Sequence, residues 1–331
     1  MAKVNTVLGP IGPDELGTTS VHEHIMFGQP GWEHDPQELF DRPTVFEKIN
    51  RDLLDLKDAG GQTLVDCSGI TMGRDVEFYQ ALSRSSGVHI VACTGFWAER
   101  GIPGHFNIVR RSATGDVPDP RFTKSIDFFE ELFVNEITQG MMLRGMRRSE
   151  AKAGVIKVGN SFEQMTPVEE TTYRAAARAA KRMGVAVITH GASQARRQVE
   201  VLLSEGLDPG RIVISHSDDA RSIDLERDKE IARRGAYVAY DHVGCEGWSP
   251  AGYHMPDERR IPLVTAMVEA GLAERLVLSC DTNGHALGWR QPPHTYGHLL
   301  RRFVPRLRQA GISEETVHTI LVENPKRLLP F

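Results

Sequence analysis

The chain has 331 residues, of which 40% are hydrophobic and 25% charged, and its formal net charge is −5. These values are typical of a soluble globular protein with a substantial core. Because acidic and basic residues are interspersed, they indicate neither a nucleic-acid-binding surface nor a basic helix that binds membranes. No apolar stretch reaches the roughly 18 residues of a membrane span, and the N-terminus lacks the pattern of a signal peptide.

The first half of the chain is predicted to alternate between strands and helices. A turn-rich hairpin over residues 4–16 precedes them. Strands are expected at 18–25, 63–67 and 89–94, and helices at 43–59, 75–85 and 125–141. A long turn-rich stretch at 101–120 interrupts the alternation before the last of these helices.

The second half keeps the same alternation, which implies a parallel sheet. Strands are expected at 155–158, 185–189, 211–215, 237–240 and 276–279. Helices are expected at 168–183, 194–205, 224–234, 261–269, 298–309 and 314–329.

Eight strands alternating with helices, in one domain over residues 1–331, predict an α/β fold of the (β/α)₈ TIM-barrel type with a short N-terminal hairpin extension. An open doubly wound sheet is the alternative. It is disfavoured because no Gly-x-Gly-x-x-Gly follows the first strand, where such a fold would bind a nucleotide.

The cysteines are Cys67, Cys93, Cys245 and Cys280, and they form no Cys-x-x-Cys pair. Three of them end apolar runs that read as strands. We interpret all four as reduced core residues of a cytoplasmic protein, not as a disulfide framework.

Polar residues end five of the predicted strands, which is where a barrel carries its catalytic groups. They are His22, His24, Lys157, His190, His216 and Asp281. His22 and His24 are two residues apart on one strand, so their imidazoles share a face. Imidazoles on one face with a carboxylate across the barrel are ligands for a transition metal.

Lys157 stands inside a β-branched run that reads as a buried parallel strand, Gly154-Val155-Ile156-Lys157-Val158-Gly159. A buried ammonium without a partner loses its charge, and the neutral amine is a nucleophile. The alternative is that the lysine extends from the end of the strand to solvent.

These motifs together resemble the phosphotriesterase family of the amidohydrolase superfamily, which includes phosphotriesterases and phosphotriesterase-like lactonases. The resemblance covers essentially the whole chain, with the motifs in order. They are His22-Glu23-His24, Ile156-Lys157-Val158, Thr189-His190, His216-Ser217-Asp218-Asp219 and Cys280-Asp281.

The resemblance implies a binuclear metal centre. His22, His24 and Asp281 would hold the more buried ion, and His190 and His216 the more exposed one. Lys157 would bridge both ions as a carbamate, that is, as a carboxylated lysine. Zn²⁺ is the expected metal, with Co²⁺, Mn²⁺ or Fe²⁺ as alternatives. The resemblance also suggests a homodimer.

The expected reaction is attack of a metal-bridging hydroxide on an ester-type bond, because bound cations lower the pKa of water. Asp281 would accept the hydroxide proton. His242 and Asp219 stand at the positions where the family has a proton relay behind that aspartate. The alternative for His242 is that it only orients the metal ligands.

The expected substrate is a small molecule, and Phe96, Trp97 and Trp289 are predicted to bind it. Trp97 resembles the aromatic of the leaving-group pocket in true phosphotriesterases, whereas lactonases have a tyrosine nearby and an arginine in place of His242. The loop at 282–293 is shorter than in the phosphotriesterases. We therefore expect lactones or carboxyl esters as natural substrates, with organophosphate triester hydrolysis as main or side activity.

Three other functions remain open. An N-acyl amide hydrolase would use the same metals, but its amine leaving group needs a general acid. A non-catalytic binding barrel is disfavoured because every predicted metal ligand is present. A barrel that grips a phosphate near its last two strands is disfavoured because the loops at 244–247 and 283–285 carry little basic charge.

Overall fold

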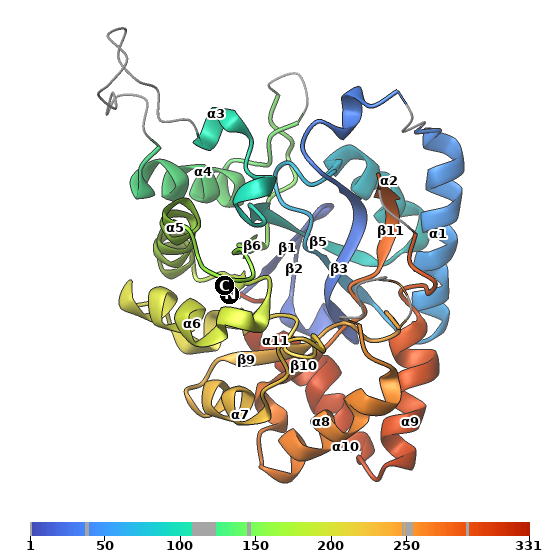
Figure 1. The fold of residues 1–331 in the computed structure, drawn as a ribbon. Coiled ribbons are helices and arrows are strands. Elements are labelled where there is room, and N and C mark those ends of the chain that lie inside the picture. The colour runs from blue at the N-terminus through green and yellow to red at the C-terminus, as the bar shows by residue number, and fades with distance from the viewer. Residues whose placement is uncertain are drawn as a thin grey trace, which may run out of the picture.

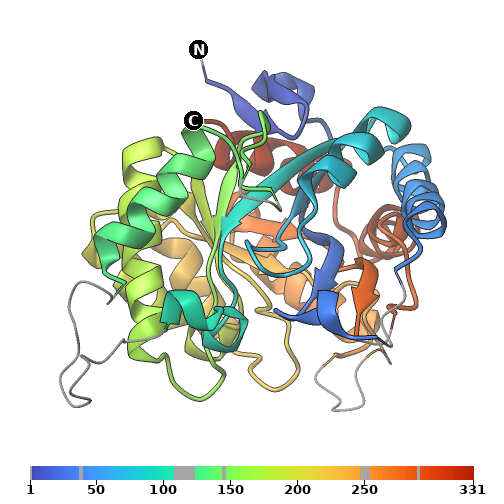
Figure 2. The same cartoon turned by 90° about the horizontal axis from the view of Figure 1, so that it is seen from above.

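The computed structural model describes residues 2–36, 40–107, 124–143, 147–246, 248, 254–288 and 291–331. The chain opens with the predicted hairpin, in which β1 (Val4–Thr6) pairs antiparallel with β2 (Gly9–Ile11). The hairpin lies at the N-terminal end of the barrel, because the Asn5 side chain donates to the Ala153 carbonyl just before a barrel strand. Figure 2 shows the two chain ends close together beside it.

The main sheet is parallel and has the strand order β10-β9-β8-β7-β6-β5-β4-β3-β11. Its strands are β3 (Thr19–Gly28), β4 (Thr63–Asp66), β5 (His89–Gly95), β6 (Val155–Lys157), β7 (Ala186–Ile188), β8 (Ile212–Ile214), β9 (Tyr237–Tyr240), β10 (Leu276–Leu278) and β11 (Asn283–Leu287). The first eight coincide with the predicted strands. β11 was not predicted, because Asn-Gly-His-Ala-Leu lacks strand-like alternation and pairs only with the extended end of β3.

The sheet curls and closes between β3 and the residues that follow β10. The backbone N–H of Asp281 donates to the His22 carbonyl at 3.1 Å, and that of His24 donates to the Thr282 carbonyl at 2.8 Å. Figure 1 shows the strands in the centre with the helices around them. The predicted (β/α)₈ barrel is therefore confirmed.

The helices are α1 (Arg42–Asp58), α2 (Val76–Ser86), α3 (Gly104–Asn107), α4 (Ile126–Thr138), α5 (Pro167–Met183), α6 (Ala195–Ser204), α7 (Leu225–Arg233), α8 (Asp257–Glu269), α9 (Val304–Gln309), α10 (Glu314–His318) and α11 (Asn324–Leu328). α3 starts within the stretch predicted as turn-rich at 101–120, and most of that stretch lies outside the described residues. α8 begins four residues earlier than predicted, because a buried ion pair between Asp257 and Arg260 fixes its first turn.

The two C-terminal helices are less regular than predicted. π-helical turns occupy Leu299–Phe303 and Thr319–Glu323. A proline follows each turn by two residues, at Pro305 and Pro325. Proline has no N–H and its ring clashes with the carbonyl four residues earlier, so the helix widens locally ahead of it.

Helix termini follow local signals that the sequence carries. Thr166 and Glu169 form a capping box at the start of α5, with Pro167 at the first helical position. Gly184 ends the helix at φ 79°, a conformation that favours glycine. The Ala-rich face of α5 packs on the sheet, and a second apolar cluster, which includes Val21, fills the inside of the barrel. This core fixes the strand ends that carry the polar residues.

Among the described residues, no helix combines the length and the apolar character needed to cross a membrane.

Candidate metal centre

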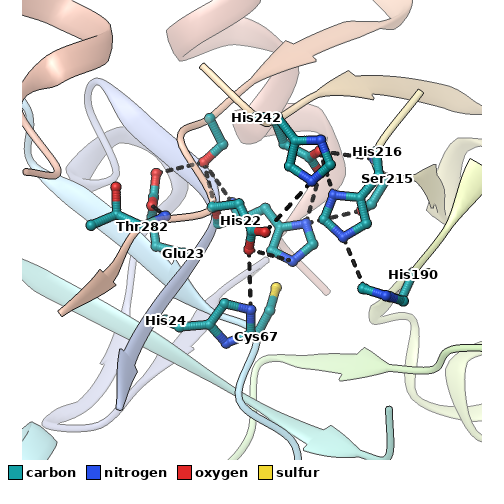
Figure 3. A network of polar contacts seen from close by, with 12 residues as sticks. His22, Glu23, His24, Cys67, His190, Ser215, His216, His242 and Thr282 are labelled. Carbon is teal, nitrogen blue, oxygen red and sulfur yellow. Dashed lines mark hydrogen bonds and ion pairs between the residues drawn. The ribbon is translucent and has the colours of Figure 1, made fainter. Parts of the chain in front are cut away.

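The predicted metal ligands meet at the C-terminal end of the barrel, although they come from five strands. Figure 3 shows the four histidines of the set, which are His22, His24, His190 and His216. His22 and His24 lie on β3 and Lys157 ends β6. His190, His216 and Asp281 follow β7, β8 and β10 within three residues. Parallel strands end on the same side of a barrel, so residues distant in sequence become neighbours there.

Asp281 lies against the two histidines of β3. Its Oδ1 atom is 3.2 Å from His24 Nε2 and 3.6 Å from His22 Nε2. Asp281 Oδ1 is buried and has no hydrogen-bond partner among the described residues, although both histidines face it. An orphaned carboxylate oxygen between two imidazole nitrogens is the arrangement expected around a cation.

Lys157 is 1% exposed, so the alternative that it extends to solvent is wrong. Its Nζ atom lies 2.9 Å from His22 Nε2 and 2.9 Å from the Thr189 carbonyl. No carboxylate of the described residues forms an ion pair with it within 4.0 Å. A buried lysine that lacks an anionic partner fits the predicted carbamate, which turns the cationic group into an anion that metal ions can share.

His190 and His216 form the second part of the cluster. His190 Nδ1 is 2.9 Å from His216 Nε2. Burial and the nearby His216 and Lys157 lower the pKa of His190 well below its ordinary value, and burial with the charge of Lys157 lowers that of His22 to about 3. Metal ions bind neutral imidazole, so the His190 and His22 rings are in the state that ligation requires.

Burial by itself would raise the pKa of Asp281. The His24 ring, whose Nε2 atom lies 3.2 Å away, and the charges of His22 and His216 outweigh burial, and hold this pKa well below its ordinary value. The carboxylate is therefore ionised. This donor set consists of four imidazoles, a carboxylate and a buried lysine. It fits a binuclear centre of transition-metal ions.

Asp241 was not among the predicted site residues, yet it joins the two halves of the cluster. Its carboxylate lies 2.7 Å from His22 Nδ1 and 2.8 Å from His216 Nδ1. It also accepts the backbone N–H of His216 at 2.8 Å. Such a contact keeps the proton on Nδ1, so that Nε2 can bind metal. The signal in the sequence was its position directly after a strand, beside His242.

His242 stacks on His216 with ring centroids 4.3 Å apart, and its Nε2 atom is 3.7 Å from Asp281 Oδ2. Burial is the main cause that lowers its pKa to about 4, so the ring is neutral and can accept a proton. On its other side, Nδ1 lies 3.8 Å from Asp218. Asp219, the predicted relay partner, forms an ion pair with Arg221 at 2.7 Å.

A model of the phosphotriesterase family matches residues 2–329 of the chain. The chain belongs to the phosphotriesterase family. It is therefore a metal-dependent hydrolase, and the buried His and Asp side chains at the C-terminal end of the barrel are candidate donors for the metal.

Relatives within the phosphotriesterase family match over nearly the full length. The phosphotriesterase homology protein of Mycobacterium tuberculosis is 30% identical over 340 residues, which cover 99% of this chain and 98% of the relative. The N-acetyltaurine hydrolase of Bos taurus is 30% identical over 365 residues, with coverage of 99% and 98%. A solved structure of a mutant PTE-like lactonase from Deinococcus radiodurans is 32% identical and has a TM-score of 0.85. The match covers 98% of this chain and 99% of the lactonase chain.

This member of the phosphotriesterase family has a cavity of about 580 Å³ above the cluster. Trp97 lines it and contacts the His190 ring at 5.1 Å between centroids. Phe96 does not line it, because this residue is buried among the aromatic rings of the core. Its position gives no support to the prediction that it binds substrate. Trp289, the third predicted substrate contact, lies outside the described residues.

The remaining walls of the cavity are largely apolar, and two arginine side chains also line it. The apolar side chains include Phe27, Met72 and Trp248. Arg100 lies over the Trp97 ring at 4.0 Å, and Arg221 over the Phe162 ring at 4.5 Å.

Proposed function

We propose that the protein hydrolyses an ester-type bond, with lactones or carboxyl esters as natural substrates and phosphotriester hydrolysis as main or side activity. The observation that carries this proposal is the buried His, Asp and Lys cluster at the floor of an apolar-walled cavity of about 580 Å³. Such a cavity suits a small, mostly apolar ester placed against the metal centre. The full-length similarity to a PTE-like lactonase supports the same assignment.

We assign His22, His24 and Asp281 to one ion and His190 and His216 to the other, with carboxylated Lys157 between them. Zn²⁺ is the proposed metal. Two such cations would supply Lewis acidity toward a carbonyl or phosphoryl oxygen and lower the pKa of water.

The protein's own groups then move the proton. Asp281 is the proposed acceptor, because its ionised carboxylate faces the ligand cluster. His242 is the proposed next proton acceptor, because its ring is neutral and its Nε2 atom lies 3.7 Å from Asp281 Oδ2. Asp219 remains the proposed end of the relay, although the carboxylate found 3.8 Å from His242 Nδ1 is that of Asp218. Trp97 is the proposed substrate contact beside the metal ligands.

A second candidate is the hydrolysis of an N-acyl amide that carries an anionic group. The similarity to an N-acetyltaurine hydrolase supports it, since that substrate combines an amide with a sulfonate. Arg100 and Arg221 both line the cavity and could contact such an anion. The amine leaving group would need a proton, which His242 could return after taking it from Asp281.

A substrate panel with the metal-loaded enzyme tests both candidates. The panel contains five- and six-membered lactones, an aryl ester, a paraoxon-like triester, N-acetyltaurine and an uncharged N-acetylamine of equal length. We expect the highest kcat/KM with a lactone or ester. A kcat/KM for N-acetyltaurine at least tenfold above every ester would replace our proposal by the second candidate. Chelated enzyme and Asp281→Asn serve as controls with strongly reduced activity. Activity that stays unchanged in both would come from a contaminating esterase.

We further propose that the chain is one domain over residues 1–331, acts in the cytoplasm and forms a homodimer, with no nucleic-acid or membrane partner. Light scattering after size-exclusion chromatography should give twice the 36.8 kDa mass of the chain. A single species at the mass of the chain would exclude the dimer.

A further inference from the structure

Asp281 has an unusual backbone conformation. Its φ is 50°, and His216, with φ 59°, is the only other non-glycine residue with positive φ in the described part of the chain. Both are proposed metal ligands. A left-handed conformation is unfavourable for a residue with a side chain, so surrounding contacts must hold it in place.

For His216 the holding contact is evident. Its own backbone N–H donates to Asp241 Oδ1 at 2.8 Å, and the same oxygen accepts from its imidazole. A buried carboxylate on the neighbouring strand therefore fixes both the backbone and the side chain of this residue.

For Asp281 the equivalent carboxylate is that of Glu23. Glu23 Oε1 accepts the backbone N–H of Cys280 at 2.9 Å, and Oε2 accepts that of Thr282 at 2.7 Å. These two peptide groups flank Asp281. One carboxylate thus bridges the chain on both sides of the left-handed residue, which fixes the direction in which its side chain leaves the backbone.

The rest of the Glu23 environment keeps this bridge rigid. Glu23 is completely buried. The hydroxyl of Ser279 donates to Oε1 at 2.8 Å, and that of Ser20 donates to the same atom. Four donors therefore converge on the two oxygens of Glu23 and fix the orientation of its side chain. Figure 3 shows Glu23 beside Thr282, where β3 meets the segment after β10.

Glu23 stands between two proposed metal ligands but cannot be one of them. Side chains alternate along a strand, so Glu23 leaves β3 on the face opposite to His22 and His24. Among the described residues, the hydrogen bonds of its carboxylate are all with the segment at 279–282 and with Ser20. The His-Glu-His sequence therefore places two ligands on one face and, on the other, the group that holds a third ligand.

We propose that Glu23 is a positioning residue that holds Asp281 in the left-handed conformation from which its carboxylate reaches His22, His24 and His242. The proposal rests on the assignment of Asp281 as a metal ligand. It predicts that loss of the bridge weakens metal binding and proton acceptance together, without loss of any direct ligand.

The test uses Glu23→Gln in the full-length protein. An amide of the same shape keeps one acceptor, but its NH₂ group faces the second peptide N–H, so one side of the bridge is lost. We expect metal affinity, measured by competition with a chromophoric chelator, to fall about 10–100-fold, as for other residues that support metal ligands. At saturating metal, kcat should fall while KM stays within about twofold.

The matched control is Glu136→Gln. Glu136 is also a buried carboxylate, but it pairs with Arg74 and accepts the N–H of Met142, away from the cluster. This variant should lower Tm and leave the metal dissociation constants unchanged. If Glu23→Gln behaves in the same way, with lower Tm and unchanged metal affinity, the proposal that Glu23 positions a metal ligand is wrong.

A second measurement separates this proposal from the proposed function. In metal-free protein, Glu23→Gln should speed hydrogen exchange of the peptide at 279–283 by tenfold or more, with no change at 186–188. Faster exchange with unchanged metal affinity would show that Glu23 holds the segment but that Asp281 is not a ligand. Unchanged exchange would overturn the positioning role itself. Should Glu23→Gln fail to fold, Ser20→Ala removes one donor to the same carboxylate, and we expect the same effects at about two- to threefold.

Discussion

Asp241 offers the sharpest test of how the proposed metal site is organised, because it contacts one proposed ligand from each half of the cluster. Its Oδ2 atom lies within hydrogen-bonding distance of His22 Nδ1, at 2.7 Å. Its Oδ1 atom serves His216 twice, through the imidazole at 2.8 Å and the backbone N–H at 2.8 Å. Asp241→Asn keeps the shape of the side chain but replaces one oxygen by an NH₂ group.

The contacts predict which half of the cluster loses metal affinity in this variant. The amide should turn its oxygen toward His216, because two donors meet it there, and its NH₂ group toward His22. His22 then loses a charge-assisted hydrogen bond, typically worth about 1.5–3 kcal/mol, or roughly 10–100-fold in an equilibrium constant. Its Nδ1 must also become an acceptor, which moves the proton to Nε2, the atom that faces Lys157 and Asp281.

We therefore expect one of the two metal dissociation constants to rise about 10–100-fold and the other about threefold or less. Stepwise competition with a chromophoric chelator measures both constants, and metal analysis after dialysis should find about one ion per chain. Asp228→Asn is the control, because Asp228 is a buried aspartate that pairs with Arg227 and contacts no ligand. Equal weakening of both steps in Asp241→Asn, or of neither, would refute this reasoning.

Four further outcomes are expected. Lys157→Ala should lose most of its metal, as metal analysis can show, and regain part of its activity with acetate. Lys157→Arg should stay inactive, since a guanidinium cannot carry a carbamate. An Arg variant as active as the parent would show that the lysine is only structural. Asp281→Asn should lower kcat by about 10²–10⁴-fold with little change in KM. His242→Ala should slow esters with activated leaving groups more than sluggish ones, and a common factor across the series would show that His242 only orients the ligands. Burial lowers the pKa of His294 from 6.5 to about 4, so the unfolded chain binds a proton that the folded protein does not. Folding stability of the metal-free protein should therefore fall by about 2 kcal/mol from pH 7 to pH 5 relative to His294→Asn, as measured by urea unfolding.

Much of the fold was determined locally. The alternation of short apolar strands with capped helices predicted eight strands and the barrel, because strand period, capping residues and glycine stops each act within a few residues. β11 was missed, since its pairing with β3 depends on a partner more than 250 residues earlier in the chain. The π-helical turns were missed because a proline inside a helical pattern can end, kink or widen the helix, and the sequence does not say which of these occurs.

That the proposed metal ligands would lie together was also predictable from sequence, because the ends of parallel strands must meet at one end of a closed barrel. What the sequence alone could not decide was which polar neighbours would support them. Asp241 and Glu23 looked like ordinary residues beside a strand end and between two histidines. Phe96 looked equivalent to Trp97, yet one enters the core and the other the cavity. These assignments depend on side-chain direction and on contacts across the closing strands, and such contacts exist only after the two ends of the sheet have joined.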